Sequence, residues 1–465
     1  MNCPSVRLSV SLALAALSLL SAVGLPAADD VAGDLITFST NGGWCWYQDE
    51  RVIVDNGRLL IGSVPANPAI DQENGDIEVV VYDFATSAAA RIELHGQLQN
   101  DDHAAPAFLV RPDGRYLAMY SKHGSDYYAR WRISVNPGDP YTWQDEQAIY
   151  MWAGVTYSNL FRLGEENSGA GRTYDFHRSL GWHPNYLYSD DDGSSWTYGA
   201  RMLYFNRERP YVKYCSNNTD RIHFTTTEAH PRDYGCGIYH GYFMDGKVYA
   251  SDGTLLSDLS TSGAVWVPDL TTVFNGDWEH NAWTTDMQLD ENGDPYAAFT
   301  VQINETGSDN RYHYARWDGG QWHVHEMAYA GSCLYDAEDN YTGLAALNPH
   351  DPNEVYISTD ANPATGDPLI SAGDGLRHWE IFRGVTDDGG ASWTWHPVTW
   401  NSTEDNLRPI IPIWDADHTM LLWLRGTYST YTSYKQSIVG LFQPQRAFPA
   451  ALADVVTTPT LTIRK

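Results

Sequence analysis

The chain has 465 residues, of which 43% are apolar and 13% aromatic, so it can pack a core and is neither disordered nor fibrous. Its 39 glycines and 23 prolines favour turns, and helical spacing of Ala, Leu, Glu and Lys is scarce after residue 30, which indicates β structure. The formal net charge of −30 argues against nucleic acid and anionic membranes as partners, because both are bound mainly through Lys and Arg.

The first segment, residues 1–28, is predicted to be a secretory signal. The positive charge of Arg7 precedes an apolar run over residues 8–22, and small residues follow up to Ala28. The run is too short to span a membrane as a helix. We therefore expect an exported mature chain, residues 29–465, whose few cysteines exclude a disulfide-dense scaffold.

The mature chain repeats one pattern: an apolar strand, a polar turn with Gly, Asn or Asp, and a second strand rich in aromatic and β-branched residues. It predicts seven hairpins, at residues 46–64, 106–121, 158–178, 210–227, 282–301, 344–359 and 409–425. Successive hairpins start roughly 50 to 75 residues apart, about the length of a four-stranded blade. We therefore predict an all-β fold: a single-domain, seven-bladed β-propeller with its core between the stacked blades.

Two short motifs support this fold. Residues 189–196 (SDDDGSSW) and 386–393 (TDDGGASW) fit the pattern S/T-x-D-x-G-x-S/T-W. The pattern resembles the Asp-box of sialidase-like propellers, in which the Asp caps a hairpin between the two outer strands and the Trp packs between blades. Because this turn lies away from the ligand in enzymes and non-enzymes alike, it is evidence for the fold only.

The residues just before the first strand and just after the second strand of each hairpin surround one opening of a propeller. Positive and protonatable side chains gather there in the second to fourth repeats: His103, His123, Tyr157, Arg178, Arg209, Tyr211 and His230. Arg pairs with carboxylates, and His and Tyr transfer protons, so we predict an anionic, carbohydrate ligand at this opening. The alternatives are structural: hydrogen-bonded loop histidines, an aromatic packing residue and arginines that brace loops.

A second cluster has the chemistry of a metal site. His230, Cys236 and His240 lie close together in the sequence, and His183 on the neighbouring blade could add a fourth ligand. Two or three imidazoles and a thiolate suit Zn²⁺, so we predict a structural zinc ion at these four residues. The alternative is a structural loop with a buried free cysteine.

Three stretches of sequence resemble a known family. They are GGWCWYQDERVIVDNGRLLIG, DDHAAPAFLVRPDGRYLAMYSKHG, and a region that contains RPYVKY, RIHFTTTEAHPR and YHGY. They resemble the BNR-repeat propellers and, among them, the ulvan lyases, which are polysaccharide lyases with seven blades. The resemblance runs from about residue 42 to residue 440. It implies cleavage of an acidic polysaccharide of rhamnose sulfate and uronic acid by β-elimination.

The resemblance also implies roles for individual residues. By it, His103 and His123 look like the family's two active-site histidines, Tyr157 like its catalytic tyrosine and Arg178 like its carboxylate-neutralising arginine. Further substrate contacts are implied for Tyr211 and His230, and we add Arg209 beside them. The cluster of His230, Cys236, His240 and His183 resembles a zinc site of the family, with different spacing.

The chemistry of β-elimination suits these residue types. The proton next to a uronate carboxylate is removed only if the carboxylate charge is neutralised, and Arg178 would do this by stabilising the enolate-like intermediate. His123 would take the C5 proton as the base. Tyr157, of a type with an unperturbed pKa of about 10, would protonate the leaving O4, or serve in both roles if Arg178 stabilises its phenolate.

Two other functions stay open. One is a glycoside hydrolase of the sialidase or rhamnosidase type; a sialidase needs three arginines around a carboxylate, and Arg178, Arg209, Arg408 and Arg425 are predicted at the opening. The Arg-Ile-Pro segment typical of a sialidase is absent. The other is a non-catalytic, carbohydrate-binding propeller. We favour a secreted, monomeric lyase whose partner is an anionic polysaccharide.

Overall fold

The computed structural model describes residues 30–70, 72–206, 208–304, 306–335, 337–415, 418–444 and 461–462. The predicted signal, residues 1–28, lies outside these ranges. Within them, regular structure is almost entirely β, and the helical elements are four 3₁₀ turns of three residues each. No helix in the described ranges is long and apolar enough to cross a membrane.

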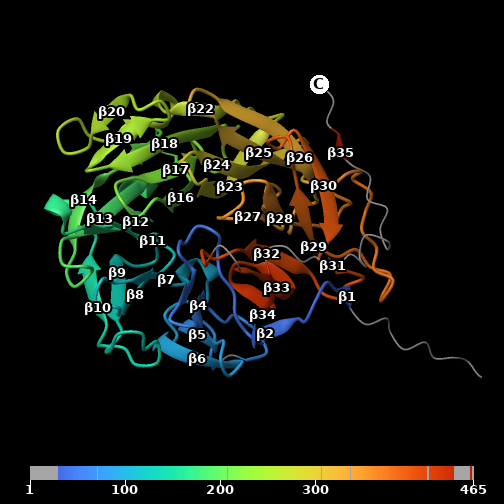
Figure 1. Cartoon of the computed structure of the whole chain (residues 1–465), viewed down its shortest axis with the longest axis horizontal. Helices are drawn as coiled ribbons and strands as arrows, with labels where there is room; N and C mark the ends of the chain where they lie inside the picture. Colours follow the sequence, from blue (N-terminus) through green and yellow to red (C-terminus); the bar gives the residue numbers. More distant parts are fainter. Residues whose placement is uncertain are drawn as a thin grey trace, which may run out of the picture.

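Seven sheets of four or more strands are arranged around a central axis (Figure 1). Blade 1 contains β3 (Val52–Asp55), β4 (Arg58–Ser63), β5 (Ile77–Asp83) and β6 (Ala88–His95). Blade 2 contains β7 (Ala107–Val110), β8 (Tyr116–Ser121), β9 (Tyr128–Ile133) and β10 (Gln147–Tyr150). Blade 3 contains β11 (Thr156–Leu163), β12 (Arg172–Arg178), β13 (Pro184–Ser189) and β14 (Thr197–Arg201).

The remaining blades follow the same antiparallel order. Blade 4 contains β16 (Val212–Ser216), β17 (Ile222–Thr226), β18 (Ile238–Met244), β19 (Lys247–Ala250), β20 (Leu255–Asp258) and β22 (Thr271–Phe274). Blade 5 contains β23 (Asn281–Leu289), β24 (Pro295–Gln302), β25 (Asn310–Trp317) and β26 (Trp322–Gly331). Blade 6 contains β27 (Ala345–Leu347), β28 (Glu354–Thr359), β29 (Glu380–Val385), β30 (Ser392–Pro397) and β35 (Leu461–Thr462).

Blade 7 closes the ring with strands from both ends of the described chain. It contains β32 (Asn406–Ile410), β33 (His418–Thr430), β34 (Ser433–Pro444) and the N-terminal β2 (Ile36–Ser39). β2 pairs with β34, with Ile36 opposite Gly440. Two short two-stranded sheets lie outside the blades. They pair β1 (Asp30–Val31) with β31 (Thr399–Trp400), and β15 (Leu203–Tyr204) with β21 (Val265–Trp266).

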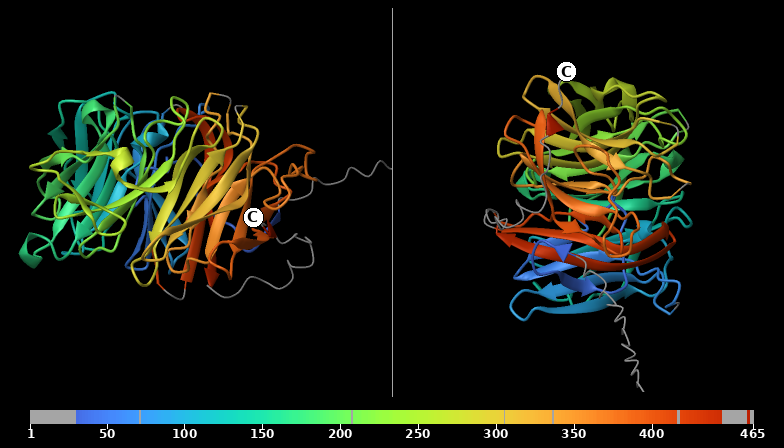
Figure 2. Two further views of the ribbon diagram at one scale, coloured as in Figure 1. Left: turned by 90° about the horizontal axis from the view of Figure 1, so that it is seen from above. Right: turned by 90° about the vertical axis from the view of Figure 1, so that its right-hand side faces the viewer.

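The prediction of a seven-bladed propeller is confirmed. Each predicted hairpin supplies the first two strands of one blade, from β3 and β4 in blade 1 to β32 and β33 in blade 7. Seen edge-on, the strands run from one face of the molecule to the other (Figure 2). We call the face where the first strand of each blade begins the site face.

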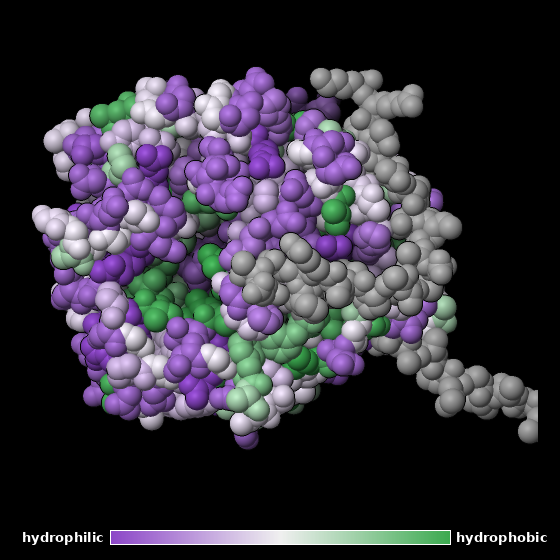
Figure 3. Space-filling model, viewed as in Figure 1, coloured by the Kyte–Doolittle hydropathy of each residue, from purple (hydrophilic) through white to green (hydrophobic). Residues whose placement is uncertain are grey.

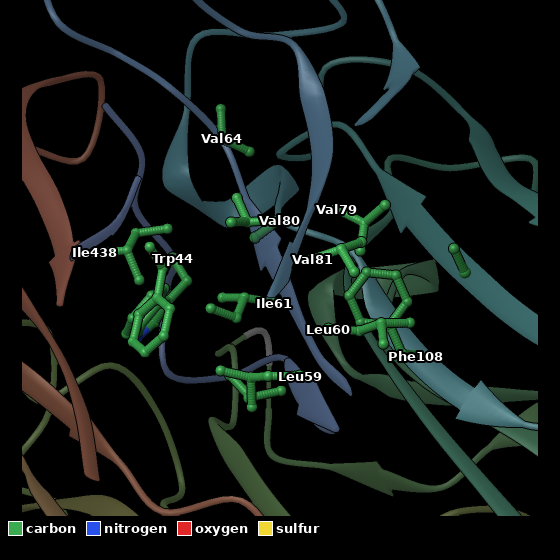
Figure 4. Packing of buried hydrophobic residues seen from close by; sticks show 14 of the residues in the cluster. Trp44, Leu59, Leu60, Ile61, Val64, Val79, Val80, Val81, Phe108 and Ile438 are labelled. Atoms are coloured by element: carbon green, nitrogen blue, oxygen red, sulfur yellow. The ribbon is translucent and has the colours of Figure 1, made fainter. Parts of the chain in front are cut away.

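The core lies between blades, so both faces of a sheet are buried and its inner strands read as continuous apolar runs. In β4, Leu59, Leu60 and Ile61 are all fully buried. Successive side chains of β4 point to opposite faces of the sheet (Figure 4). Leu60 lies beside Phe108 of blade 2, whereas Leu59 and Ile61 point toward Trp44 and Ile438. Each blade is therefore held by its neighbours rather than by a core of its own.

Both Asp-box motifs form the predicted turns. They join β13 to β14 and β29 to β30, the two outer strands of their blades. The Asp191 carboxylate accepts a hydrogen bond from the Ser195 backbone N–H at 2.8 Å, and Asp388 accepts the equivalent bond from Ser392 at 2.9 Å. Their tryptophans pack against neighbouring blades, with Trp393 at 5.4 Å from the ring of Tyr314.

The face opposite the site face carries an apolar groove of about 980 Å³. It is lined at the ends of the inner strands, for example by Val54 of β3, Val110 of β7 and Phe161 of β11. Figure 3 shows hydrophobic side chains gathered in a hollow over the region of β7 and β11. The titratable side chains predicted to bind a ligand lie on the site face.

Candidate functional site

A cleft of about 560 Å³ opens on the site face. Six of the seven predicted catalytic or substrate-contacting residues line it: His103, His123, Tyr157, Arg209, Tyr211 and His230. The seventh, Arg178, lies directly behind, with its guanidinium 4.7 Å from the ring of Tyr157 and 5.2 Å from the ring of Tyr211. The structure therefore brings all seven together from three blades.

The two histidines come from the loops at the two ends of the inner hairpin of blade 2. His103 lies in the 3₁₀ turn η1 (Asp102–Ala104), just before β7, and His123 follows β8. Their rings are stacked, with centroids 3.9 Å apart and an angle of 5° between the ring planes. The predicted placement of the pair across this hairpin is confirmed.

Asp101 joins the two rings. His103 and His123 both donate from Nδ1 to its carboxylate, to Oδ1 at 2.7 Å and to Oδ2 at 2.9 Å. The same side chain caps the turn by accepting from the His103 backbone N–H at 3.0 Å. Burial favours the neutral acid, but the two imidazoles outweigh it and hold the pKa of Asp101 below its usual value.

The two imidazoles have opposite pKa shifts. Burial opposes the charge of His103, but Tyr157 and Cys45, followed by Asp101 and Asp102, raise its pKa well above 6.5. Burial and then the neighbouring charge of His103 lower the pKa of His123 to about 4, against the pull of Asp101. At neutral pH His103 is therefore a cation and His123 is a neutral ring whose Nε2 can accept a proton.

Arg178 is a buried cation without an anionic partner. Arg178 lies at the end of β12 and is 4% exposed. The ring of Trp182 covers its guanidinium at 5.5 Å. Its Nη2 lies 3.4 Å from His123 Nε2. Nε and Nη1 have no hydrogen-bond partner, and no carboxylate pairs with the group in the described part of the chain. A buried, uncompensated charge is costly, so this arrangement suits an anionic ligand.

Tyr157 is held at an irregular point of β11. Its backbone has a φ of 64°, in the left-handed region, and the register with β12 shifts between Thr156 and Asn159. Burial raises its pKa well above 10, although the charges of His103 and Arg178 oppose this. The phenol is therefore protonated at neutral pH, which suits a proton donor and argues against the phenolate alternative.

The far wall of the cleft comes from blade 4 and from the connection between blades 5 and 6. The ring of Tyr211 meets that of His230 edge-on at 5.2 Å, and His230 Nε2 lies 3.3 Å from the Glu338 carboxylate. Burial, followed by nearby arginines, lowers the pKa of His230 well below 6.5. Arg209 pairs with Asp233 at 3.1 Å. This wall offers neutral and paired groups, in contrast to the unpaired charge of Arg178.

Arg408, predicted at the opening, is fully buried and unavailable to a ligand. It donates to Asp102 at 2.7 Å and to the Tyr341 hydroxyl at 2.5 Å. Tyr428 also donates to Asp102, at 3.0 Å. Arg408 therefore supports the turn that carries His103 rather than forming an arginine set with Arg178.

Among the groups at this cleft that sequence reasoning missed are Asp101, Glu338 and Tyr431. Asp101 was visible in the DDHAAP stretch, where an acid two residues before a histidine can reach its ring. Tyr431 lies edge-on to His103 at 5.3 Å and to His123 at 5.6 Å. It was missed because β33 extends to Thr430, five residues beyond the predicted end of that hairpin at residue 425.

The structure does not bring the four predicted zinc ligands together. His230 faces the cleft beside Glu338, Cys236 Sγ lies 3.3 Å from the Ala229 carbonyl oxygen, and His240 Nδ1 lies 2.7 Å from Ser251 Oγ. His183 joins none of them. Among the described residues, ligand atoms of three or more His, Cys, Asp or Glu converge in two groups: Cys45, Asp102 and His103, and Asp101, His103 and His123. Both groups belong to the histidine pair, whose Nδ1 atoms already face carboxylates.

Comparison with solved structures supports the fold. An ulvan lyase of polysaccharide lyase family PL25, solved bound to -[GlcA(1-4)Rha3S]-, superposes with a TM-score of 0.61 at 16% identity, over 91% of this chain and 98% of that one. The polysaccharide lyase Uly1 superposes with a TM-score of 0.57 at 10% identity, over 89% and 100%. No curated protein matches the sequence. Residues 45–330, more than half of the chain, match the BNR repeat-containing family, and the protein is therefore a member of that family.

Proposed function

We propose that the protein is a polysaccharide lyase that cleaves a uronate-containing polysaccharide by β-elimination. The observation that carries the proposal is the buried guanidinium of Arg178, with two nitrogens unpaired among the described residues, beside an unprotonated imidazole and a protonated phenol. These are the three groups that the reaction needs: a partner for the carboxylate, a base and an acid.

The reaction can be written with these groups. The uronate carboxylate binds Arg178 and gains further stabilisation from the cationic His103 as negative charge moves onto it from C5. His123 Nε2 takes the C5 proton, and Asp101 keeps the other ring nitrogen protonated. The C4–O4 bond breaks, Tyr157 gives its proton to the leaving oxygen, and a C4=C5 double bond forms. Proton exchange with solvent returns His123 and Tyr157 to their starting states.

The hydrolase alternatives have less support. Glycoside hydrolysis commonly uses two carboxyl groups that flank the scissile bond. Among the described residues that line the cleft, the carboxylate is that of Glu338, which His230 and Arg232 engage. A sialidase-like set of arginines is not available either, because Arg209 pairs with Asp233 and Arg408 with Asp102. A purely binding protein would not need histidines with opposite pKa shifts.

We propose an ulvan-like polymer as the substrate and export as the location. A glucuronate such as that in the ulvan lyase complex would present one carboxylate to Arg178. The signal-like residues 1–28 suit a protein that acts on a polymer too large to enter a cell. We expect a monomer.

The test is an ultraviolet assay for the unsaturated product, with ulvan, alginate and polygalacturonate as separate substrates. We expect rising absorbance with ulvan and a loss of about 100-fold or more in kcat/KM for Arg178→Ala, because an unscreened charge contact at the reacting carboxylate is removed. Arg178→Lys should recover part of the loss, since it restores charge without two parallel donors. New reducing ends without absorbance would show a hydrolase and overturn the proposal.

A further inference from the structure

Five aromatic side chains are exposed on the site face outside the cleft. They are Tyr127, Tyr128, Tyr150, Trp152 and Trp182, and we call them the rim aromatics. Trp152 is 65% exposed, Trp182 is 49% exposed, and the three tyrosines are between 41% and 46% exposed. Four of them belong to β9, β10 and the chain beside these strands, in the outer half of blade 2 (Figure 1).

Four of the rings are in contact through Tyr150, and we call these four the row. Tyr150 meets Tyr128 at 5.4 Å, Tyr127 at 5.9 Å and Trp152 at 5.9 Å. All three contacts are edge-to-face, so the rings brace one another while each side chain stays at least 41% exposed. The row is one exposed cluster of aromatic rings and not a set of scattered apolar side chains.

The row is continuous with the cleft. The loop that carries Trp152 is bonded to the loop that carries His123, because Gly124 donates its backbone N–H to the Val155 carbonyl at 2.9 Å and Met151 donates to Tyr127 at 2.8 Å. Trp182 lies over the same loop: a Cβ on Gly124 would be only 3.0 Å from its ring. That ring also covers Arg178. The rim aromatics therefore start at the catalytic arginine and lead outward over blade 2.

Folding does not explain the two tryptophans. Trp152 is 65% exposed and Trp182 is 49% exposed, and both have left-handed backbone, with φ of 59° for Trp152 and 64° for Trp182. This conformation is unfavourable for a residue with a side chain and, where it persists, is often found at functional sites. Charge recognition does not explain the row either, since Arg130, beneath Tyr128, is paired with Asp126 at 2.5 Å.

We propose that the rim aromatics are a distal saccharide-binding site, which stacks sugar rings of the same polysaccharide several units away from the bond that is cleaved. The proposal rests on the proposed function for the identity of the polymer. Flat aromatic faces with polar edges suit pyranose rings, which present apolar C–H faces and hydroxyl edges. A site of this kind binds long chains more tightly and leaves the reacting groups unchanged.

The test compares a double variant, Tyr150→Ala with Trp152→Ala, with the control Tyr141→Ala. Tyr141 is exposed to the same extent as Tyr150, at 42%, but lies in the loop between β9 and β10 at the other end of these strands. We expect the KM for ulvan to rise about tenfold in the double variant, equivalent to ~1.4 kcal/mol, with kcat little changed. On the shortest oligosaccharide that is cleaved, double variant and control should match the wild type.

Binding is measured separately by electrophoresis in gels that contain ulvan, alginate or polygalacturonate. Retardation of the wild type that is lost in the double variant supports the site, even if no polymer is cleaved; in that case the proposed function fails alone. An unchanged KM for ulvan, an equal loss on short and long substrates, or no retardation by any polymer overturns the inference. So does a dimer of the wild type that the double variant dissociates, because the row would then be an interface between two copies.

Discussion

The charge state of the two stacked histidines is decided by single residues around them. Two positive charges 3.9 Å apart would repel by roughly 4 kcal/mol at an effective dielectric constant of 20. The two imidazoles are therefore not both cationic near neutral pH. Asp102 lies beside His103 and not beside His123, so the single positive charge stays on His103. His123 is left as the base although it touches a cation.

The pH dependence of activity follows from this asymmetry. His123 must be unprotonated to take the C5 proton, and its pKa is lowered to about 4. We therefore expect kcat/KM to be low below pH about 4, where the base is protonated, and to rise to a plateau above that pH. A pH profile of kcat/KM on ulvan checks this. A limb near the ordinary histidine value of about 6.5 would contradict the assignment of His123 as the shifted base.

Asp101 is expected to act through the histidines without touching the substrate. In Asp101→Asn, His103 keeps Asp102 but loses its other carboxylate partner, so its pKa should fall and its positive charge should be lost at a lower pH than in the wild type. We expect kcat/KM to fall by about 10- to 100-fold, the equivalent of one lost charged hydrogen bond, with a new decline as pH rises through the neutral range. Asp113→Asn, at an exposed turn of the same blade, is the control. An unchanged pH profile would show that Asp101 only shapes its loop.

At the scale of the element, the hairpin is the unit that sequence patterns describe well. The inner hairpin of blade 2 has turn residues that allow a tight reversal and ends that leave His103 and His123 on the site face. Irregular elements follow different rules. The register shift in β11 gives Tyr157 its left-handed backbone, and only pairing with β12 reveals it.

The Asp-box turns permit a matched test of backbone strain and crowding. Gly389 and Gly390 both have positive φ, of 74° and 95°, but a Cβ on Gly389 would meet nothing within 4 Å, whereas one on Gly390 would lie 2.3 Å from the buried ring of Tyr314. We expect Gly389→Ala to cost about 1 kcal/mol in free energy of unfolding and Gly390→Ala about 3 kcal/mol. Urea unfolding measures both. Equal costs would mean that the ring of Tyr314 yields without penalty.

At the scale of the whole molecule, closure of the ring depends on β2. A chain that begins at Asp34 keeps this strand, and a chain that begins at Thr40 lacks it and leaves β34 as an open edge. We expect the shorter chain to lose at least about 3 kcal/mol of stability, because Phe38 and its neighbours no longer pack in blade 7. Thermal unfolding of the two chains compares them directly. Equal melting temperatures would show that the ring is stable without closure.

The net charge also has a molecular meaning. The chain has 59 acidic and 29 basic residues, yet the side of the cleft that we propose to be catalytic holds Arg178 and a cationic His103. The positive groups are buried at the cleft, so we expect them to act at short range on one carboxylate of the proposed substrate rather than to attract polyanions over the whole surface.

The sequence by itself determined the blade number, the hairpins and the face on which the histidine, tyrosine and arginine set lies. These depend on local patterns: strand alternation, turn residues and the place of each side chain relative to a hairpin. Only the tertiary structure decided what meets across blades. It brought Asp101 to both histidines, added Tyr431 from blade 7 and left Arg178 without an acid among the described residues. It also separated His230, Cys236 and His240, because neighbours in sequence diverge once one faces the cleft, one faces a backbone carbonyl and one lies inside a sheet.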